Sequence, residues 1–343
     1  MASLERNVFY MGNTKYRSLH LKKRFETYYW FNMELRQLRY FAAIAKHGTF
    51  SKAAEQVFVA QSALSHQLAQ LEAELGTRLL HRSRRGVELT ETGRIFLAHA
   101  TAILRQVDDA KASVRNLDGN PSGTVVFGVP HSVSNALALP LLQAVRQHLP
   151  KVELELTEEL TGNLIQQLRN GQINLAVLFD DGTLDEFSSE HLLDEHLALI
   201  SHASAPDRPQ TSVTLQDALM LPLILPAKPH GVRPIIEAAA RAHGFSGPNV
   251  TADISSISIL RTTLLAGLGH TLLPVMPLQN ELMAGTLCAV PVKDPGLTRR
   301  LALCASKHIP LSVAATAVAR LTAELTKKLC LSKQWQGAAL IVK

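Results

Sequence analysis

Residues 61–75 carry leucine at every third or fourth position, and this spacing constrains the fold more than any other feature of the chain. One side of the expected helix holds Leu64, Leu68, Leu71 and Leu75, because residues three and four apart share a helix face. The opposite side holds small or polar residues without charge, among them Ser62, Ser65 and His66. A surface helix normally has a charged outer face. This face therefore indicates a partner that approaches closely and is recognised by hydrogen bonds.

The flanking patterns place that helix in a small helical domain over residues 33–90. A helical apolar spacing runs from Met33 to Lys46 and stops at Gly48, and a second short helix follows Thr49. The break before Gln61 and the stop at Gly76 predict a helix-turn-helix. Residues 79–90 alternate loosely and predict a hairpin, the wing of a winged helix-turn-helix. Its expected tip carries Arg82, Arg84 and Arg85.

A long helix over residues 91–118 comes next, with Thr90 as its expected cap. Its apolar residues follow each other in steps of four and three, which is the heptad pattern of helices that pair with each other. The residues of this seam are Phe96, Ala100, Ile103, Val107, Ala110 and Val114. The pattern predicts self-association of the chain, and packing of the helix on its own domain is the alternative.

The rest of the chain has another periodicity. Residues 119–123 have the composition of a hinge, and residues 124–330 alternate between short apolar strands and helices. This alternation predicts an α/β region with an open parallel sheet, and its element count favours two small lobes that the chain crosses twice. We expect residues 331–343 to form a tail. Residues 1–32 lack periodicity, so we expect a disordered extension outside the fold.

Charge is concentrated at the N-terminal end. The formal net charge is +6, and residues 1–32 carry +4 and residues 33–95 carry +3, while the remainder carries −1. A basic end on a near-neutral body suggests one polyanionic partner. The three cysteines are too sparse for a disulfide framework or a metal site, which favours a reducing cytoplasm without a metal or other cofactor. No apolar run is long enough to predict a membrane span.

The motifs "FSKAAE", "AQSALS", "LEAELG", "LLHR" and "LTETG", in this spacing, resemble the N-terminal domain of LysR-type transcriptional regulators. The segments "GQINLAVLF" and "AGLGHTLLP" resemble their effector domain. The resemblance implies a winged helix-turn-helix DNA-binding domain, a dimerisation helix and a two-lobed α/β domain like a periplasmic binding protein. It also implies a bacterial cytoplasmic regulator that binds double-stranded operator DNA as a dimer or dimer of dimers and acts on RNA polymerase. A few short segments most resemble members that control nitrogen assimilation, which are thought to act without an inducer.

The resemblance also assigns the residues that contact DNA. Base-reading positions match Gln61, Ser62, Ser65 and His66, whose amide, hydroxyl and imidazole groups suit base edges in the major groove. Many relatives carry proline and arginine at the positions of Ser62 and His66, so we expect a different site preference. We expect Arg82, Arg84 and Arg85 to flank the groove and Lys52 and Arg36 to contact phosphates.

Hydroxyl groups at expected helix starts suggest where a small-molecule effector binds. Ligands of open α/β sheets bind at the carboxyl ends of the strands, where helix N-termini attract anions. The candidates are Ser132, Ser134, Thr161, Ser255 and Ser256, with His202 as a weaker one near the crossover between the lobes. Because serine and threonine at helix starts are often caps, the same residues allow a purely structural role.

Two other classes of function remain open at this stage. Two α/β lobes with a hinge are also the architecture of solute-binding proteins and of some enzymes. The chain shows no metal-binding pair, phosphate loop or cysteine nucleophile that would support catalysis. A non-specific DNA binder would spread basic residues along the whole chain, whereas here the excess ends near Arg94.

Overall fold

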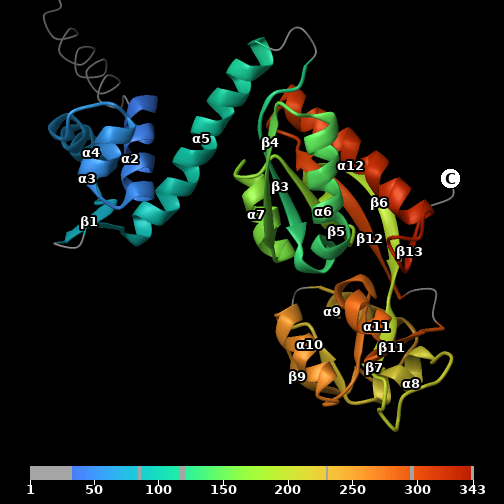
Figure 1. Cartoon of the computed structure of the whole chain (residues 1–343). Coiled ribbons are helices and arrows are strands. Elements are labelled where there is room, and N and C mark those ends of the chain that lie inside the picture. The colour runs from blue at the N-terminus through green and yellow to red at the C-terminus, as the bar shows by residue number, and fades with distance from the viewer. Residues whose placement is uncertain (1–32, 84–85, 116–119, 229–230, 294–296, 341–343) are drawn as a thin grey trace, which may run out of the picture. The chain divides into compact units, whose positions relative to one another are not determined.

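The computed structural model describes residues 33–83, 86–115, 120–228, 231–293 and 297–340 (Figure 1). The chain divides into two compact units, one up to Leu104 and one from Arg105 onward. The boundary falls inside the long helix α5 (Glu91–Arg115). The expected N-terminal extension, residues 1–32, lies outside the described residues. Among the described helices none is both long enough and apolar enough to span a membrane.

The first unit is the winged helix-turn-helix that the sequence predicts. Helices α2 (Leu35–His47), α3 (Phe50–Gln56) and α4 (Gln61–Leu75) precede a hairpin of β1 (Leu80–Ser83) and β2 (Gly86–Leu89). Gly48 and Gly76 end α2 and α4 in the left-handed region, where glycine is favoured. The hydrophobic core is formed by the apolar faces of these helices, and its buried residues include Phe41, Ile44, Leu64, Leu68 and Leu71.

Helix α5 corrects the expected seam at its N-terminal end. Ala100 is 0% exposed and belongs to the core of the first unit, and the ring of Phe96 packs against Phe41 with 5.4 Å between centroids. Ala100 is thus unavailable for pairing with a second chain, because its own domain already covers it. Farther along, Ile103 is 42% exposed and Val114 is exposed too.

The C-terminal half of α5 belongs to the second unit. The Arg105 guanidinium donates to the carbonyl of Gly171, and the Asn174 amide donates to the Asp109 carboxylate at 3.2 Å. Burial lowers the pKa of Arg105 and raises the pKa of Asp109. This half of the helix is therefore anchored by polar contacts, whereas the first half is anchored by apolar packing.

The first lobe of the second unit is built on a six-stranded sheet in the order β13-β6-β12-β5-β3-β4. Its strands are β3 (Gly123–Pro130), β4 (Val152–Glu159), β5 (Leu175–Asp180), β6 (Phe187–His196), β12 (Thr298–Ser306) and β13 (Ala338–Ala339). Helices α6 (His131–His148) and α12 (Val313–Leu331) pack together over one part of it, and α7 (Thr161–Arg169) packs on β3, β5 and β12.

The prediction of a parallel sheet is wrong for β6, β12 and β13, which form only antiparallel pairs. β3 pairs in parallel with β4 and β5, but β12 is antiparallel to both β5 and β6. The reason is the crossing of the chain: β6 leads out of the first lobe and β12 returns from the second, so they run in opposite directions. The sequence does not predict β6 itself, because its "FSSEHLLDEH" has little regular alternation.

The second lobe has two small sheets, β10-β7-β11 and β8-β9. Its strands are β7 (Ala198–His202), β8 (Leu223–Leu225), β9 (Val250–Asp253), β10 (Thr271–Leu273) and β11 (Leu287–Pro291). The helices α8 (Leu215–Met220), α9 (Arg233–Ala242), α10 (Ile257–Leu265) and α11 (Gln279–Met283) surround them. The chain enters at residue 197 and leaves before Thr298, and the backbone N–H of Leu197 donates to the Leu297 carbonyl at 3.1 Å. The two predicted crossings therefore lie side by side.

The segment expected to be a tail is part of the fold up to Leu340. Trp335 is buried in the core of the first lobe, and β13 extends the sheet by pairing with the end of β6. The His196 backbone N–H donates to the Gly337 carbonyl at 2.9 Å. The tail prediction is wrong here, because one buried tryptophan and one strand edge anchor residues that show no periodicity. Residues 341–343 lie outside the described residues.

Candidate nucleic-acid interface and inter-lobe cleft

Helix α4 presents the uncharged polar face that its sequence predicts. Leu64, Leu68 and Leu71 are buried and Leu75 is half-buried. Gln61, Ser62 and His66 are exposed, and Ser65 is half-buried. No side chain caps the N-terminus of α4, and its first turn has no acidic residue. The first backbone N–H groups are thus available to an anion, and the helix dipole favours a phosphate there. This combination suits a helix whose N-terminal end enters a major groove.

Side chains from neighbouring elements orient this face. The Ser51 hydroxyl of α3 donates to Gln61 Oε1 at 3.1 Å, and Arg82 Nη2 donates to the Ser65 hydroxyl at 3.4 Å. The Arg82 guanidinium also lies 4.6 Å from the centre of the Phe50 ring. Arg82 is therefore held against helices α3 and α4, and not at the tip of the wing where the sequence predicts it. Arg84 and Arg85 lie outside the described residues.

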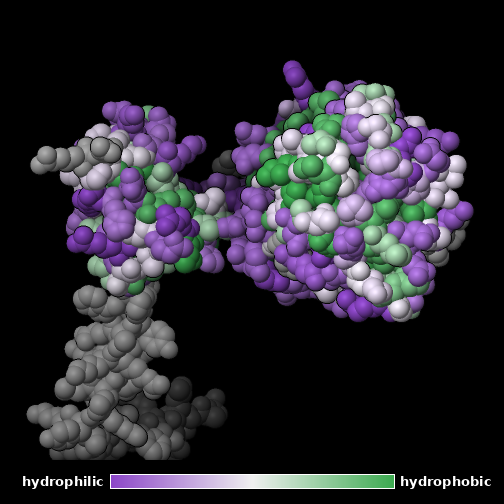
Figure 2. Space-filling model, turned by 90° about the horizontal axis from the view of Figure 1, so that it is seen from below, coloured by the Kyte–Doolittle hydropathy of each residue, from purple (hydrophilic) through white to green (hydrophobic). Residues whose placement is uncertain are grey.

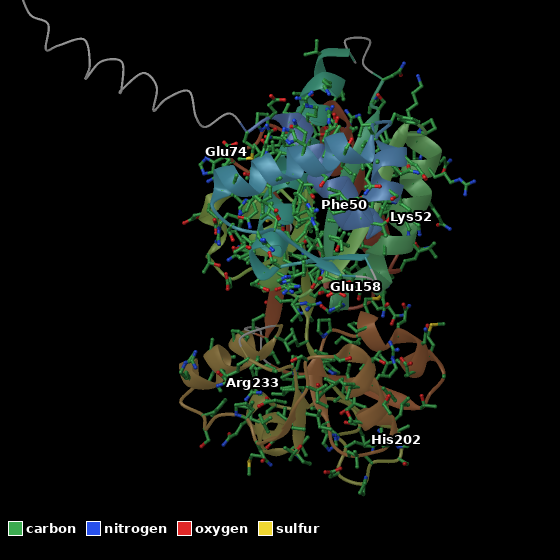
Figure 3. The ribbon with its side chains drawn as sticks, turned by 90° about the vertical axis from the view of Figure 1, so that its left-hand side faces the viewer. Phe50, Lys52, Glu74, Glu158, His202 and Arg233 are labelled. Atoms are coloured by element: carbon green, nitrogen blue, oxygen red, sulfur yellow. The ribbon has the colours of Figure 1, made fainter. Side chains whose placement is uncertain are left out.

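The two predicted phosphate contacts differ in their surroundings. Lys52 is exposed on α3, next to Phe50 (Figure 3). Arg36 forms an ion pair of 2.9 Å with Glu34, so it already has a carboxylate partner within the chain. Lys52 is accordingly the better placed of the two for a phosphate. Sequence reasoning missed Phe50 and Ser51, whose roles depend on contacts between separate helices.

A cavity of about 60 Å³ lies between the two lobes of the second unit. The carboxyl ends of β3 and β4 open onto it, as expected for an open α/β sheet. Of the six predicted effector contacts, Ser132, Thr161 and Ser255 line this cavity. The helices α6 and α7 begin at its wall, and no side chain caps either of them. Their first backbone N–H groups are therefore available to a ligand.

The other three predicted contacts do not line the cavity. The Ser134 hydroxyl donates to the His131 carbonyl, and the Ser256 hydroxyl caps α10 by accepting from the N–H of Ile259. His202 lies at the end of β7 on the side of the second lobe away from the first (Figure 3), where its ring contacts the Ser204 hydroxyl at 2.8 Å. Placing His202 at the crossover is wrong, because β7 runs from the crossover to the far end of the lobe.

The most unusual group in the cavity wall is a buried ion pair that the sequence did not predict. Arg299 lines the cavity, and its Nε donates to Glu195 Oε2 at 2.6 Å while its Nη1 donates to the Ser132 hydroxyl at 2.9 Å. The second Glu195 oxygen accepts from the Trp335 indole N–H at 2.8 Å. Burial lowers the pKa of Arg299, and Glu195 opposes this effect. The available signal was the pair of arginines, Arg299 and Arg300, at the start of the otherwise apolar strand "RRLALCAS".

One further cluster resembles a catalytic triad but cannot act as one. The Ser201 hydroxyl lies 2.6 Å from Nδ1 of His270, and Asp207 Oδ2 lies 3.2 Å from its Nε2. The hydrogen bond to His270 lowers the pKa of Asp207. Ser201 is only 2% exposed, so no substrate carbonyl can reach its hydroxyl. Groups of side chains that could hold a metal ion are absent from the described residues.

Two of the three cysteines, Cys304 and Cys330, are poorly suited to redox sensing. Burial raises the pKa of the Cys304 thiol to about 12 and also raises the pKa of Cys330. Thiol reactivity depends on the thiolate, so both residues are slow nucleophiles near neutral pH.

Comparison with known proteins identifies both units. Residues 35–94 match the family model "Bacterial regulatory helix-turn-helix protein, lysR family", and residues 118–327 match "LysR substrate binding domain". The nitrogen assimilation regulatory protein of Klebsiella aerogenes is 34% identical over 86% of this chain and 96% of its own length. The corresponding protein of Escherichia coli (strain K12) is 33% identical over 89% of this chain and 99% of its own length.

Solved structures of full-length regulators share the fold. A full-length OxyR variant from Pseudomonas aeruginosa has a TM-score of 0.67 at 22% identity, covering 91% of this chain and 100% of that one. CbnR in complex with its target DNA has a TM-score of 0.62 at 21% identity, covering 86% and 99%. At these identities the likeness concerns the fold.

Proposed function

This chain belongs to the LysR family of bacterial transcriptional regulators, and we propose that it reads a twofold-symmetric operator with helix α4, as a dimer or dimer of dimers. The observation that carries this proposal is the face of α4. Its hydrogen-bonding groups are exposed and uncharged, and its N-terminus is uncapped. Gln61 pairs with adenine, and Ser62, Ser65 and His66 contact neighbouring bases or phosphates. The chain is a DNA-binding regulator and not an enzyme, which removes support from the alternative of a solute-binding or enzymatic protein.

We propose that the regulated genes serve nitrogen assimilation. The support is the identity of 33–34% to two nitrogen assimilation regulatory proteins over nearly their full lengths. The protein acts in the bacterial cytoplasm, where it meets its operator and RNA polymerase. A small-molecule effector would bind in the inter-lobe cavity, and Ser132, Thr161 and Ser255 are its expected contacts.

The test of both proposals is genome-wide mapping of the DNA bound by this protein, followed by footprinting of the strongest sites. We expect sites with dyad symmetry upstream of nitrogen-metabolism genes. Dyad sites beside unrelated genes would refute the nitrogen assignment alone. Uniform occupancy without a shared motif would refute sequence-specific reading by α4.

We propose that α5 supplies the twofold contact through Ile103, Val107, Ala110 and Val114. These residues keep the four-three spacing beyond the part of the helix that its own domain covers. Contacts between effector domains would extend the dimer. Ile259 and Leu265 of α10 and Leu268 just after it are exposed, and Figure 2 shows a hydrophobic area on the second lobe.

Ile103→Asp should split this dimer, because a charge buried in an apolar seam is costly. Ile95→Asp is the matched control, since Ile95 is exposed on the same helix but lies outside the seam. Sedimentation should show smaller particles only for Ile103→Asp. Equal masses for both variants would refute pairing through this seam.

A further inference from the structure

The arginine that lines the inter-lobe cavity, Arg299, is already paired with a carboxylate of the chain, that of Glu195, which does not itself line the cavity. Glu195 lies near the end of β6 and Arg299 near the start of β12, and the two residues face each other in the strand pairing. Both side chains are 1% exposed. Arg299 is also the cationic residue that lines the cavity beside the Ser132 hydroxyl. The positive group to which an acidic ligand would bind is therefore paired before any ligand arrives.

The C-terminal segment holds this carboxylate from the other side. The Trp335 indole donates to the Glu195 oxygen that forms no hydrogen bond with Arg299. The same segment binds the backbone next to Glu195, because Ala338 pairs with Glu195 in the sheet and the Gly337 carbonyl accepts from His196. With both oxygens bonded and the backbone paired, Glu195 has no freedom to leave Arg299 for an incoming anion.

We propose that Glu195, positioned by Trp335, neutralises the arginine that lines the inter-lobe cavity, and that the cavity consequently admits uncharged ligands and excludes small carboxylates. The proposal rests on the proposed function, because it concerns the effector site of the regulator. It goes beyond that function by assigning a ligand class and by giving the segment that contains Trp335 a role at the cavity.

The charges around the cavity support this ligand class. The uncapped starts of α6 and α7 each contribute about half a positive charge and by themselves would favour an anion. Arg299 adds one positive charge, while Glu195 and the cavity-lining Glu159 add two negative charges. These contributions sum to about zero. The wider opening beside the cavity is lined by Asp180, Asp181 and Asp194 as well as Arg300, so an approaching anion gains no attraction there either.

The remaining lining indicates what the ligand would look like. Most of the wall is apolar, with Leu160, Phe179, Val232 and Leu273 among its residues. Arg299 Nη2 is buried and lies 2.5 Å from Glu195, so its charge is directed at the chain's own carboxylate. An uncharged, largely apolar molecule fits this surface.

The experiment removes the charge of Glu195 and supplies a carboxylate from solution. Thermal unfolding of the full chain is followed without DNA, with acetate or propionate exchanged for chloride at constant ionic strength. The wild-type protein should show no carboxylate-specific shift. Glu195→Gln keeps the shape and the acceptor for Trp335 but leaves Arg299 without its anion, so its midpoint should rise by about 2–4 °C in acetate. Omitting DNA separates a failure here from a failure of operator reading.

Glu186→Gln is the matched control, because it opens the two-contact pair between Glu186 and Arg169 on the surface of the first lobe. This variant should not respond to acetate. If Glu195→Gln unfolds on purification, refolding in acetate but not in chloride supports the proposal. A carboxylate-specific shift of the wild-type protein overturns the proposal, as does a Glu195→Gln protein that ignores carboxylates.

The positioning role of Trp335 has its own measurement. Trp335→Phe keeps an aromatic ring in the core but lacks the indole N–H, so one Glu195 oxygen loses its donor. We expect an acetate response between those of the wild type and Glu195→Gln. A purely structural role of Trp335 would lower the midpoint equally in acetate and in chloride, and that result would overturn the positioning role.

Discussion

The DNA-reading face of α4 and the wall of the inter-lobe cavity carry similar polar side chains but use them in opposite ways. On α4, Gln61, Ser62 and His66 are exposed, and the contacts within the protein leave donors and acceptors unused. In the cavity wall, Arg299 donates to Ser132 and also to Glu195, whose other oxygen accepts from Trp335. The first surface is prepared for an external partner, and the second has satisfied most of its own polar groups.

The difference follows from solvent exposure. Water satisfies unpaired groups on α4 at little cost until DNA replaces it, so this face can remain open. A buried guanidinium without a partner would destabilise the fold, so the cavity must contain a counter-charge at all times. A ligand-binding role is therefore easier to infer from α4 than from the cavity. The following predictions test this contrast, beginning with the largest expected effect.

Arg299→Met should produce the largest loss of stability. It leaves the Glu195 carboxylate buried without its cation, which costs about 3–5 kcal/mol of unfolding free energy. Urea unfolding of the full chain measures the loss. Arg169→Met, which removes the exposed partner of Glu186, is the control and should change the midpoint little. Equal losses in the two variants would contradict the contrast between buried and exposed pairs.

Restoring neutrality should recover much of this loss. In the double variant Glu195→Gln with Arg299→Met no unpaired charge remains in the cavity, and replacing both members of a buried pair is often nearly neutral. We expect the double variant to be more stable than Arg299→Met alone. A double variant that is less stable would show that shape, rather than charge, dominates this wall.

Gln61→Ala should weaken operator binding by about 1–3 kcal/mol and leave binding to unrelated DNA nearly unchanged. Gln61 is exposed, and its Oε1 accepts from the Ser51 hydroxyl, which orients the amide for base contact. Affinities for operator and scrambled duplexes at one salt concentration measure the effect. An equal loss on both duplexes would mean that α4 does not read bases.

Arg82→Ala should weaken binding to both duplexes together and lower the salt slope by about one. The reason is that Arg82 is a charge fixed beside α4 by Phe50 and Ser65, and it is not a base reader. Titrations over a range of salt concentrations give the slope. A loss confined to the operator would instead assign Arg82 to base recognition.

Phe58→Asn should have the smallest effect, a gain of up to about 1 kcal/mol in unfolding free energy, because a bulky residue is strained at positive φ and asparagine tolerates it. Phe58 lies between α3 and α4 with φ of 56°, and 93% of it is exposed. Phe58→Ala removes the ring but keeps the strain, so it should gain less in thermal unfolding. If Phe58→Asn and Phe58→Ala gained equally in unfolding free energy, loss of the exposed ring, and not relief of strain, would explain the effect.

The sequence predicts the first unit closely because its information is local. The helical spacing of α2 and α4, the stops at Gly48 and Gly76 and the cap at Thr49 depend on neighbouring residues only. The lobes are predicted less completely. β6 was missed because its sequence does not alternate, and the antiparallel course of β12 depends on where the chain crosses.

The two sites show the same limit. Exposure of Gln61, Ser62 and His66 follows from the helix period alone. The cavity wall and the ion pair of its arginine combine residues far apart in the chain, such as Ser132, Glu195 and Arg299, so no spacing rule could connect them. The serines predicted as effector contacts at one helix start have different roles in the folded chain. Ser255 lines the cavity, whereas Ser256 caps helix α10.

The sequence by itself determined the family, the helix-turn-helix and the face that α4 presents, because periodicity and short motifs record local geometry. Tertiary structure alone decided that Ala100 belongs to a core, that Trp335 is buried and that Arg299 has its own carboxylate. These facts depend on contacts between residues separated by tens to hundreds of positions, and such contacts exist only once the chain has closed its loops.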